Sequence, residues 1–162
     1  MFSEFRNWVS YDSESGLITW VKSPSANCVV GTQVGGIDKD GYAYFHLHKK
    51  RWPIHRMAWV LTQGPIPDGY EIDHIDGNRA NNKLTNLRLA TRSENNQNRR
   101  TARKDSKTGI IGVGQHKRSK LFFARIVGLD GKKRSLGYFK TPEEAGTAYL
   151  KCKREIHSFN TL

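Results

Sequence analysis

One segment near the middle of the chain has the side chains needed to hydrolyse a phosphodiester bond. It contains Asp73, His74, Asn86 and Asn95. The reaction needs a base that activates water and a cation that neutralises charge on the phosphate and on the leaving oxygen. A neutral histidine can be the base near pH 7, and a hard cation such as Mg²⁺ needs only one or two oxygen ligands from the protein. His74 can therefore supply the base, and Asp73 and Asn95 can supply the ligands.

These residues must be positioned by a strand, a loop, a second strand and a helix. Asp73 and His74 belong to a short predicted strand that runs into the turn at 76–78, followed by a strand over 87–90 and a polar helix over about 91–100. Neighbouring residues of a regular strand point to opposite faces, so both could not reach one phosphate from ideal β geometry. We therefore expect the strand to end at this pair, and a regular strand through position 76 would contradict the assignment.

Residues 71–98, EIDHIDGNRANNKLTNLRLATRSENNQN, resemble the ββα-metal motif of HNH endonucleases, most closely that of the phage and intron homing type. The upstream stretches YDSESGLITW and IHRMAW also resemble that family, so the resemblance covers about residues 8–100. It implies a phage-encoded enzyme that cleaves double-stranded DNA.

The resemblance implies a role for each residue of the motif. His74 would be the general base, Asp73 and Asn95 the metal ligands, and Asn86 the residue that pins the loop through hydrogen bonds to the backbone. The last position of the motif is Asn rather than His, which favours Mg²⁺ or Mn²⁺ over tightly bound zinc or nickel. We expect one such ion per active site and no small-molecule cofactor.

Plain structural interpretations remain open for this segment. Asp73 and His74 could be a surface pair, and Asn86 and Asn95 could be ordinary turn and cap residues. We expect the remaining polar residues of the loop to shape it rather than to bind metal; they are Asp76, Asn78, Asn81 and Asn82. His55 is expected to be structural, at the start of a helix over 55–63, although a contact to a phosphate or leaving group is conceivable. Two arginines flank the site as candidates for holding DNA phosphates; they are Arg79 and Arg88.

The N-terminal half is otherwise rich in predicted strands, over 17–22 and 42–48. His46 and His48 share one face of the second strand, and we expect them to be surface residues rather than DNA contacts. The domain that contains all these elements is expected to span residues 1–100.

The chain is strongly basic, with 27 Lys and Arg against 15 Asp and Glu and a net charge of +12. The excess is concentrated after residue 100, where 14 basic residues face 5 acidic ones. A polar stretch at 101–108 is predicted to be a linker. It is either a solvated connection or a strap that follows DNA phosphates, and its basic residues with those just before it are Arg99, Arg100, Arg103 and Lys104.

Several other classes of protein are excluded by the sequence. No apolar run approaches the roughly 20 residues that cross a bilayer, and the first residues lack a signal peptide. Cys28 and Cys152 are far apart and form no zinc motif. We therefore expect a soluble, cytoplasmic protein with no membrane partner.

The C-terminal part, residues 109–162, is predicted to be a small α+β domain. Three strands are expected over 110–115, 121–129 and 133–139, and a helix follows to about 157. Its start is marked by Thr141-Pro142-Glu143-Glu144, a capping box with proline at the first helical position.

Residues 109–157 resemble the AP2 DNA-binding domain, whose three-stranded sheet enters the major groove while its helix packs behind. By position, the DNA-facing residues would be His116, Arg118, Lys120, Arg125 and Lys133. Gly114 and Ser135 fall where plant-type AP2 domains have Arg and Trp, so the target sequence does not follow from the resemblance. The alternative is a basic sheet surface that touches only phosphates.

Together these features predict an α+β protein in which an HNH nuclease domain is joined to an AP2-like domain. One ββα motif per chain predicts a monomer or weak dimer that nicks one strand. A DNA-binding regulator with a decayed nuclease domain is the alternative. A nuclease for structured or single-stranded nucleic acid would instead need aromatic stacking platforms, for which the adjacent pair Phe122 and Phe123 is a candidate.

Overall fold

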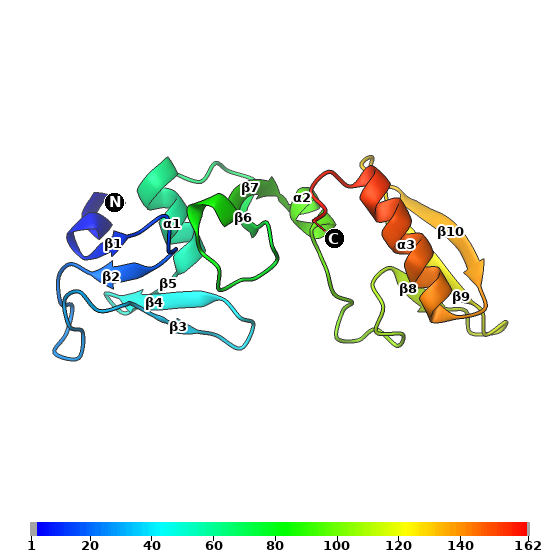
Figure 1. Cartoon of the computed structure of the whole chain (residues 1–162), viewed down its shortest axis with the longest axis horizontal. Helices are drawn as coiled ribbons and strands as arrows, with labels where there is room; N and C mark the ends of the chain where they lie inside the picture. The colour runs from blue at the N-terminus through cyan, green and yellow to red at the C-terminus, as the bar shows by residue number, and fades with distance from the viewer. Residues whose placement is uncertain (1–2, 162) are drawn as a thin grey trace. The chain divides into compact units, whose positions relative to one another are not determined.

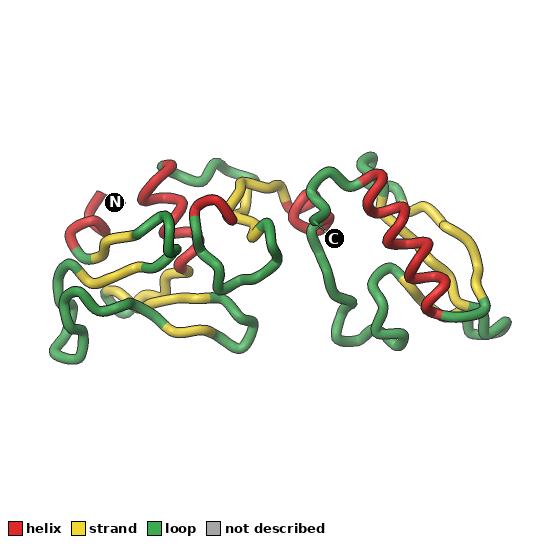
Figure 2. Tube along the Cα trace, viewed as in Figure 1, coloured by secondary structure: helices red, strands yellow, loops and turns green. Residues whose placement is uncertain are grey.

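A computed structural model describes residues 3–161 (Figure 1). The chain forms two compact units, the first ending at Arg92 and the second beginning at Ser93. Both are mixed α/β structures built from small antiparallel sheets and helices (Figure 2). Within the described residues, no helix combines the length and apolar character needed to cross a membrane.

The first unit begins with a 3₁₀ helix at Ser3–Asn7 and two small sheets. One sheet pairs two strands, and the other has three strands in the order β3-β4-β5. The strands are β1 Val9–Tyr11, β2 Ile18–Trp20, β3 Gly36–Ile37, β4 Ala43–Leu47 and β5 Lys50–Pro53. Helix α1, Ile54–Gln63, follows β5 directly and contributes Ile54 and Met57 to the same core as Ile18 and Phe45.

The expected order of strand, loop, strand and helix is present in the segment around His74. Strand β6, Tyr70–His74, pairs antiparallel with β7, Leu87–Thr91. The 3₁₀ turn Leu84–Asn86 precedes β7, and helix α2, Arg92–Gln97, follows it. Strand β6 ends at His74 and does not continue through position 76, as the sequence analysis expects.

The second unit is a three-stranded antiparallel sheet, order β10-β9-β8, with one helix against it (Figure 1). Its elements are β8 Val113–Gln115, β9 Phe122–Val127, β10 Lys133–Phe139 and α3 Pro142–Ile156. Residues 110–112 form a turn rather than the start of a strand. The predicted capping box is present, because Thr141 accepts from the Glu144 amide while the Glu144 carboxylate accepts from the Thr141 amide.

The core of the second unit follows the predicted alternation along β9. Ala124 and Ile126 are buried against α3, whereas Arg125 and Val127 are exposed on the opposite face. One residue is unexpected: Lys153 of α3 is only 1% exposed. Its Nζ donates to the backbone carbonyl of Arg99, which gives the buried amine a hydrogen-bond acceptor.

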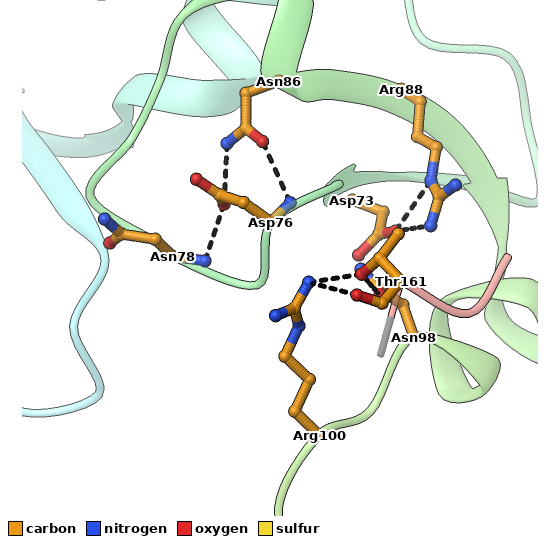
Figure 3. A network of polar contacts seen from close by, with 8 residues as sticks. All are labelled: Asp73, Asp76, Asn78, Asn86, Arg88, Asn98, Arg100 and Thr161. Carbon is orange, nitrogen blue, oxygen red and sulfur yellow. Dashed lines mark hydrogen bonds and ion pairs between the residues drawn. The ribbon is translucent and has the colours of Figure 1, made fainter. Parts of the chain in front are cut away.

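The division between the units falls inside α2, whereas the sequence analysis places the domain boundary after residue 100. Hydrogen bonds within the second unit account for this difference. Thr161 Oγ1 donates to Asn98 Oδ1 at 2.8 Å, and the Arg100 guanidinium donates to Thr161 (Figure 3). With the Lys153 bond to Arg99, these contacts tie residues 98–100 to the C-terminal end of the chain.

Candidate active site

Asp73 and His74 are buried at the end of β6, with 6% and 4% of their surface exposed. Ile72 beside them is also buried, so the last three residues of the strand are covered on both faces. Ile72 packs in a small cluster with Ala58 of α1 and Leu87 of β7. Asp73 and His74 therefore do not form a surface pair.

Asp73 is paired with Arg88, which lies directly opposite it in the β6–β7 register. Arg88 donates from Nε at 2.9 Å and from Nη2 at 2.8 Å, both to Asp73 Oδ2 (Figure 3). The sequence analysis names Arg88 as a candidate for holding DNA phosphates. In this structure its guanidinium pairs with a buried carboxylate, because cross-strand partners on adjacent strands are close enough to pair.

Asn86 holds the loop between the two strands closed. Its Oδ1 accepts from the Asp76 amide at 3.0 Å, and its Nδ2 donates to Asp76 Oδ1 at 2.9 Å and to the Asn81 carbonyl at 2.8 Å (Figure 3). The Asn78 amide also donates to Asp76. Burial by itself would raise the pKa of Asp76, but hydrogen bonds from Asn81, Asn78 and Asn86 lower it below its usual value. Asp76 therefore organises the loop as an ionised hydrogen-bond acceptor.

A layer of aromatic rings lies against His74. The His55 ring, from the first turn of α1, meets the His74 ring nearly edge-on with centroids 5.1 Å apart. Tyr42 lies 5.3 Å from His55 and 6.2 Å from His74. Arg79, an exposed residue, stacks over Tyr42 at 4.6 Å and donates to the Asp40 carbonyl. Arg79 thus contacts the ring layer that borders His74.

Burial keeps both histidines of this layer neutral. Desolvation lowers the pKa of His55 to about 3, with smaller contributions from the charges of His74 and Arg56. Desolvation also lowers the pKa of His74, although Asn82, Asp76 and Asp73 oppose the effect. A histidine that is neutral near pH 7 is in the protonation state that a general base requires.

The two predicted metal ligands belong to different elements, β6 and α2. Asp73 is a buried carboxylate at a strand end, and oxygen donors of this kind suit Mg²⁺ or Mn²⁺. Asn95 is half-buried on α2, in the second unit. Within residues 3–161 no three His, Cys, Asp or Glu side chains are grouped as a metal site. A site with one carboxylate and one amide would not form such a group, so the metal remains a prediction.

The basic residues of the linker have different surroundings. Arg99, Arg103 and Lys104 are exposed. Arg100, predicted to contact DNA, is half-buried and hydrogen-bonded to Thr161. The guanidinium of Arg100 therefore stabilises the second unit in this structure.

The outer face of the second unit's sheet carries cations and aromatic rings. Arg125 and Lys133 are exposed on it, and the Arg125 guanidinium lies 4.4 Å from the Phe123 ring centroid. Tyr138, 56% exposed, is paired with Phe123 across the strands. The remaining predicted DNA-facing residues are exposed in the β8–β9 turn; they are His116, Arg118 and Lys120.

Gly114 has a physical reason for lacking a side chain. A Cβ there would lie 2.8 Å from Cε2 of Phe123, whose ring covers the glycine. An arginine at this position would force Phe123 to move.

The sequence analysis does not identify Asn82, Tyr42 or His55 as residues in contact with His74. His74 Nε2 lies 3.1 Å from Asn82 Oδ1. Tyr42 and His55 are distant in sequence from His74, and no motif spacing identifies them as its neighbours. Only the IHRMAW resemblance pointed toward His55.

Comparison with known proteins gives one family model and several similar proteins. A family model described as HNH endonuclease matches residues 53–97. Protein 3.8 of Escherichia phage T7 is 34% identical over 119 residues, which are 74% of this chain and 93% of that protein. The DNA endonuclease I-HmuI of Bacillus phage SP01 is 38% identical over 66 residues, 38% of each chain. A solved structure of DNA binding and cleavage by the HNH homing endonuclease I-HmuI has a TM-score of 0.45 and 22% identity, covering 94% of this chain and 88% of that chain.

Proposed function

Because this chain belongs to the family of phage T7 protein 3.8 and contains an HNH endonuclease domain, we propose that it is a metal-dependent, homing-type endonuclease that cleaves duplex DNA. The observation that carries the proposal is the pair at the end of β6: a buried carboxylate, Asp73, beside a buried histidine with a lowered pKa, His74. A general base and an oxygen ligand for a divalent cation are groups that phosphodiester hydrolysis can use.

His74 activates the attacking water in this proposal. Desolvation lowers its pKa, so at neutral pH the ring is uncharged and can accept a proton. The edge-on contact with His55 restricts the orientation of the ring.

Asp73 and Asn95 would hold one Mg²⁺ or Mn²⁺ ion. When bound, the cation would neutralise charge on the phosphate and on the departing 3′ oxygen. Arg88 keeps the Asp73 carboxylate oriented through Oδ2, and Asn86 keeps the loop after β6 closed. Hydrolysis with a 3′ leaving oxygen gives 5′-phosphate and 3′-hydroxyl ends.

The second half of the chain would bring the enzyme to a preferred site. We assign residues 1–100 to the nuclease domain, 101–108 to a basic linker and 109–162 to an AP2-like domain. The outer sheet face, with exposed Arg125 and Lys133, would lie against duplex DNA. One ββα motif per chain makes the enzyme a nicking monomer or weak dimer, in the cytoplasm of a phage-infected bacterium.

Conversion of supercoiled plasmid tests the proposal. The parent protein should nick the plasmid with Mg²⁺ and not with EDTA, and His74→Ala should be at least ~100-fold slower, as expected for a lost general base. His46→Ala, which removes an exposed histidine of β4, is the matched control and should keep parental activity. Equal rates for the parent and His74→Ala would contradict the assigned base. Salt-sensitive duplex binding without cleavage by either protein would favour the DNA-binding regulator.

A further inference from the structure

We infer that Asn82 is a positioning residue for His74, holding the ring proton on Nε2 so that Nδ1 is the basic nitrogen. This inference rests on the proposed function, in which His74 is the base. Asn82 touches neither water nor phosphate in this scheme, and acts only through the histidine.

The orientation of the Asn82 amide is determined by its two contacts. Its side chain is buried, and its Nδ2 donates to the Ala80 carbonyl at 3.1 Å. The other end of the amide, Oδ1, therefore faces His74 Nε2 at 3.1 Å. An amide oxygen can only accept hydrogen bonds, so Nε2 must be the donor. In a neutral imidazole with the proton on Nε2, the lone pair that can accept a proton is on Nδ1.

The alternative tautomer would be unfavourable at this position. With the proton on Nδ1, the lone pair of Nε2 would face the lone pairs of Asn82 Oδ1 inside the protein. Buried polar atoms without a complementary partner destabilise a structure by about 1–3 kcal/mol each. The contact therefore selects one of the two neutral forms of His74.

The N-terminal hairpin, β1–β2, is hydrogen-bonded to the backbone at and near Asn82. The Tyr11 hydroxyl donates to the Asn82 carbonyl at 2.8 Å, and the Leu84 amide donates to the Ser13 carbonyl at 3.2 Å. Burial, with the charge of Asp12, raises the pKa of Tyr11 to about 12, so the hydroxyl remains a donor at any physiological pH.

Gly16 of the same hairpin touches the loop even more closely. A Cβ at this residue would lie 2.6 Å from the Asn82 carbonyl carbon and nearer still to the Lys83 nitrogen, and its φ is +75°. Both Tyr11 and Gly16 lie outside the region matched by the HNH family model. The hairpin thus positions the base through Asn82, although it contributes no group to the reaction.

Ring ¹⁵N spectra of the full chain test the tautomer directly. In the parent at pH 7, without metal, His74 should show a protonated Nε2 and an unprotonated Nδ1, and loss of its signals in His74→Ala assigns them among the six histidines. In Asn82→Ala, signals of the Nδ1-protonated form should appear. Asn27→Ala, at an exposed asparagine, should leave the spectrum unchanged.

Steady-state nicking with Mg²⁺ gives a second readout. Asn82→Ala should lower kcat by about 10–100-fold, the range seen when the hydrogen-bond partner that orients a metal-ligating histidine is removed, with KM for DNA unchanged. Asn82→Asp, which retains an acceptor oxygen, should keep the Nε2 proton and most of the activity. Tyr11→Phe leaves the Asn82 amide intact, so it should lower kcat less than Asn82→Ala does.

A His74 ring protonated on Nδ1 in the parent, or the same tautomer in parent and Asn82→Ala, would overturn the inference. If the parent has the Nε2 proton but does not cleave DNA with any divalent cation, the proposed function fails while the structural assignment of Asn82 stands. If Asn82→Ala does not fold, the ring tautomer of His74 in the parent and in Asn82→Asp still decides the question.

Discussion

Replacement of Arg88 by methionine should destabilise the first unit by removing a charged partner of the buried Asp73 carboxylate. Both Arg88 bonds go to Asp73 Oδ2, at 2.8 and 2.9 Å, and the Asp73 side chain is only 7% exposed. Breaking a fully buried pair costs about 3–5 kcal/mol, and we expect about 2–3 kcal/mol here because water can reach an arginine site of intermediate exposure. The arginine side chain is 22% exposed.

Urea denaturation in EDTA measures this loss. The four tryptophans, Trp8, Trp20, Trp52 and Trp59, all belong to the first unit, so their fluorescence follows its unfolding. Arg51→Met, which removes the partner of Asp38 in a more exposed ion pair of the same unit, is the matched control and should cause a clearly smaller loss.

A double-mutant cycle separates the loss of the Asp73–Arg88 ion pair from the loss of packing by the arginine side chain. Asp73→Asn combined with Arg88→Met removes both charges, so it should be more stable than Arg88→Met alone. The reasoning is refuted if Arg88→Met unfolds at the same urea concentration as the parent, or if the double variant is no more stable than the single one.

Two further predictions concern pH and DNA binding. The pKa of His55 is lowered from 6.5 to about 3, so the unfolded chain binds a proton that the folded one does not, and stability falls as the pH drops below 6.5. Between pH 7 and pH 5 the free energy of unfolding of the parent should fall by about 2 kcal/mol through this group. In urea titrations at the two pH values, the free energy of unfolding of His55→Phe should fall correspondingly less. Equal losses in the two proteins would exclude His55 as the cause. In duplex binding measured against salt, Arg125→Ala and Lys133→Ala should each reduce the slope of log Kd against log salt by about 1. Arg154→Ala, exposed on α3, should leave the slope as it is, and a result with the roles reversed would place DNA on the helix side of the sheet.

Much of the fold can be predicted from patterns among residues that are close in sequence. The end of β6 at His74, the capping box at Thr141 and the alternation of buried and exposed residues along β9 all agree with the sequence-based predictions. These features depend on hydrogen bonds and side-chain directions within a few residues, which the local sequence determines. The types of the site residues also follow from the sequence, because phosphodiester hydrolysis needs a base and oxygen ligands.

The partners of those residues were decided by tertiary structure. Arg88 pairs with Asp73 because β6 and β7 align in one register, and His55 meets His74 because α1 packs against β6. Arg100 is bonded to Thr161, and Lys153 to Arg99, because the end of the chain returns to α2. Each of these contacts joins residues at least 15 positions apart, where no local rule of hydrogen bonding or periodicity applies. Only the packing of whole elements determines which of these distant polar groups are buried together.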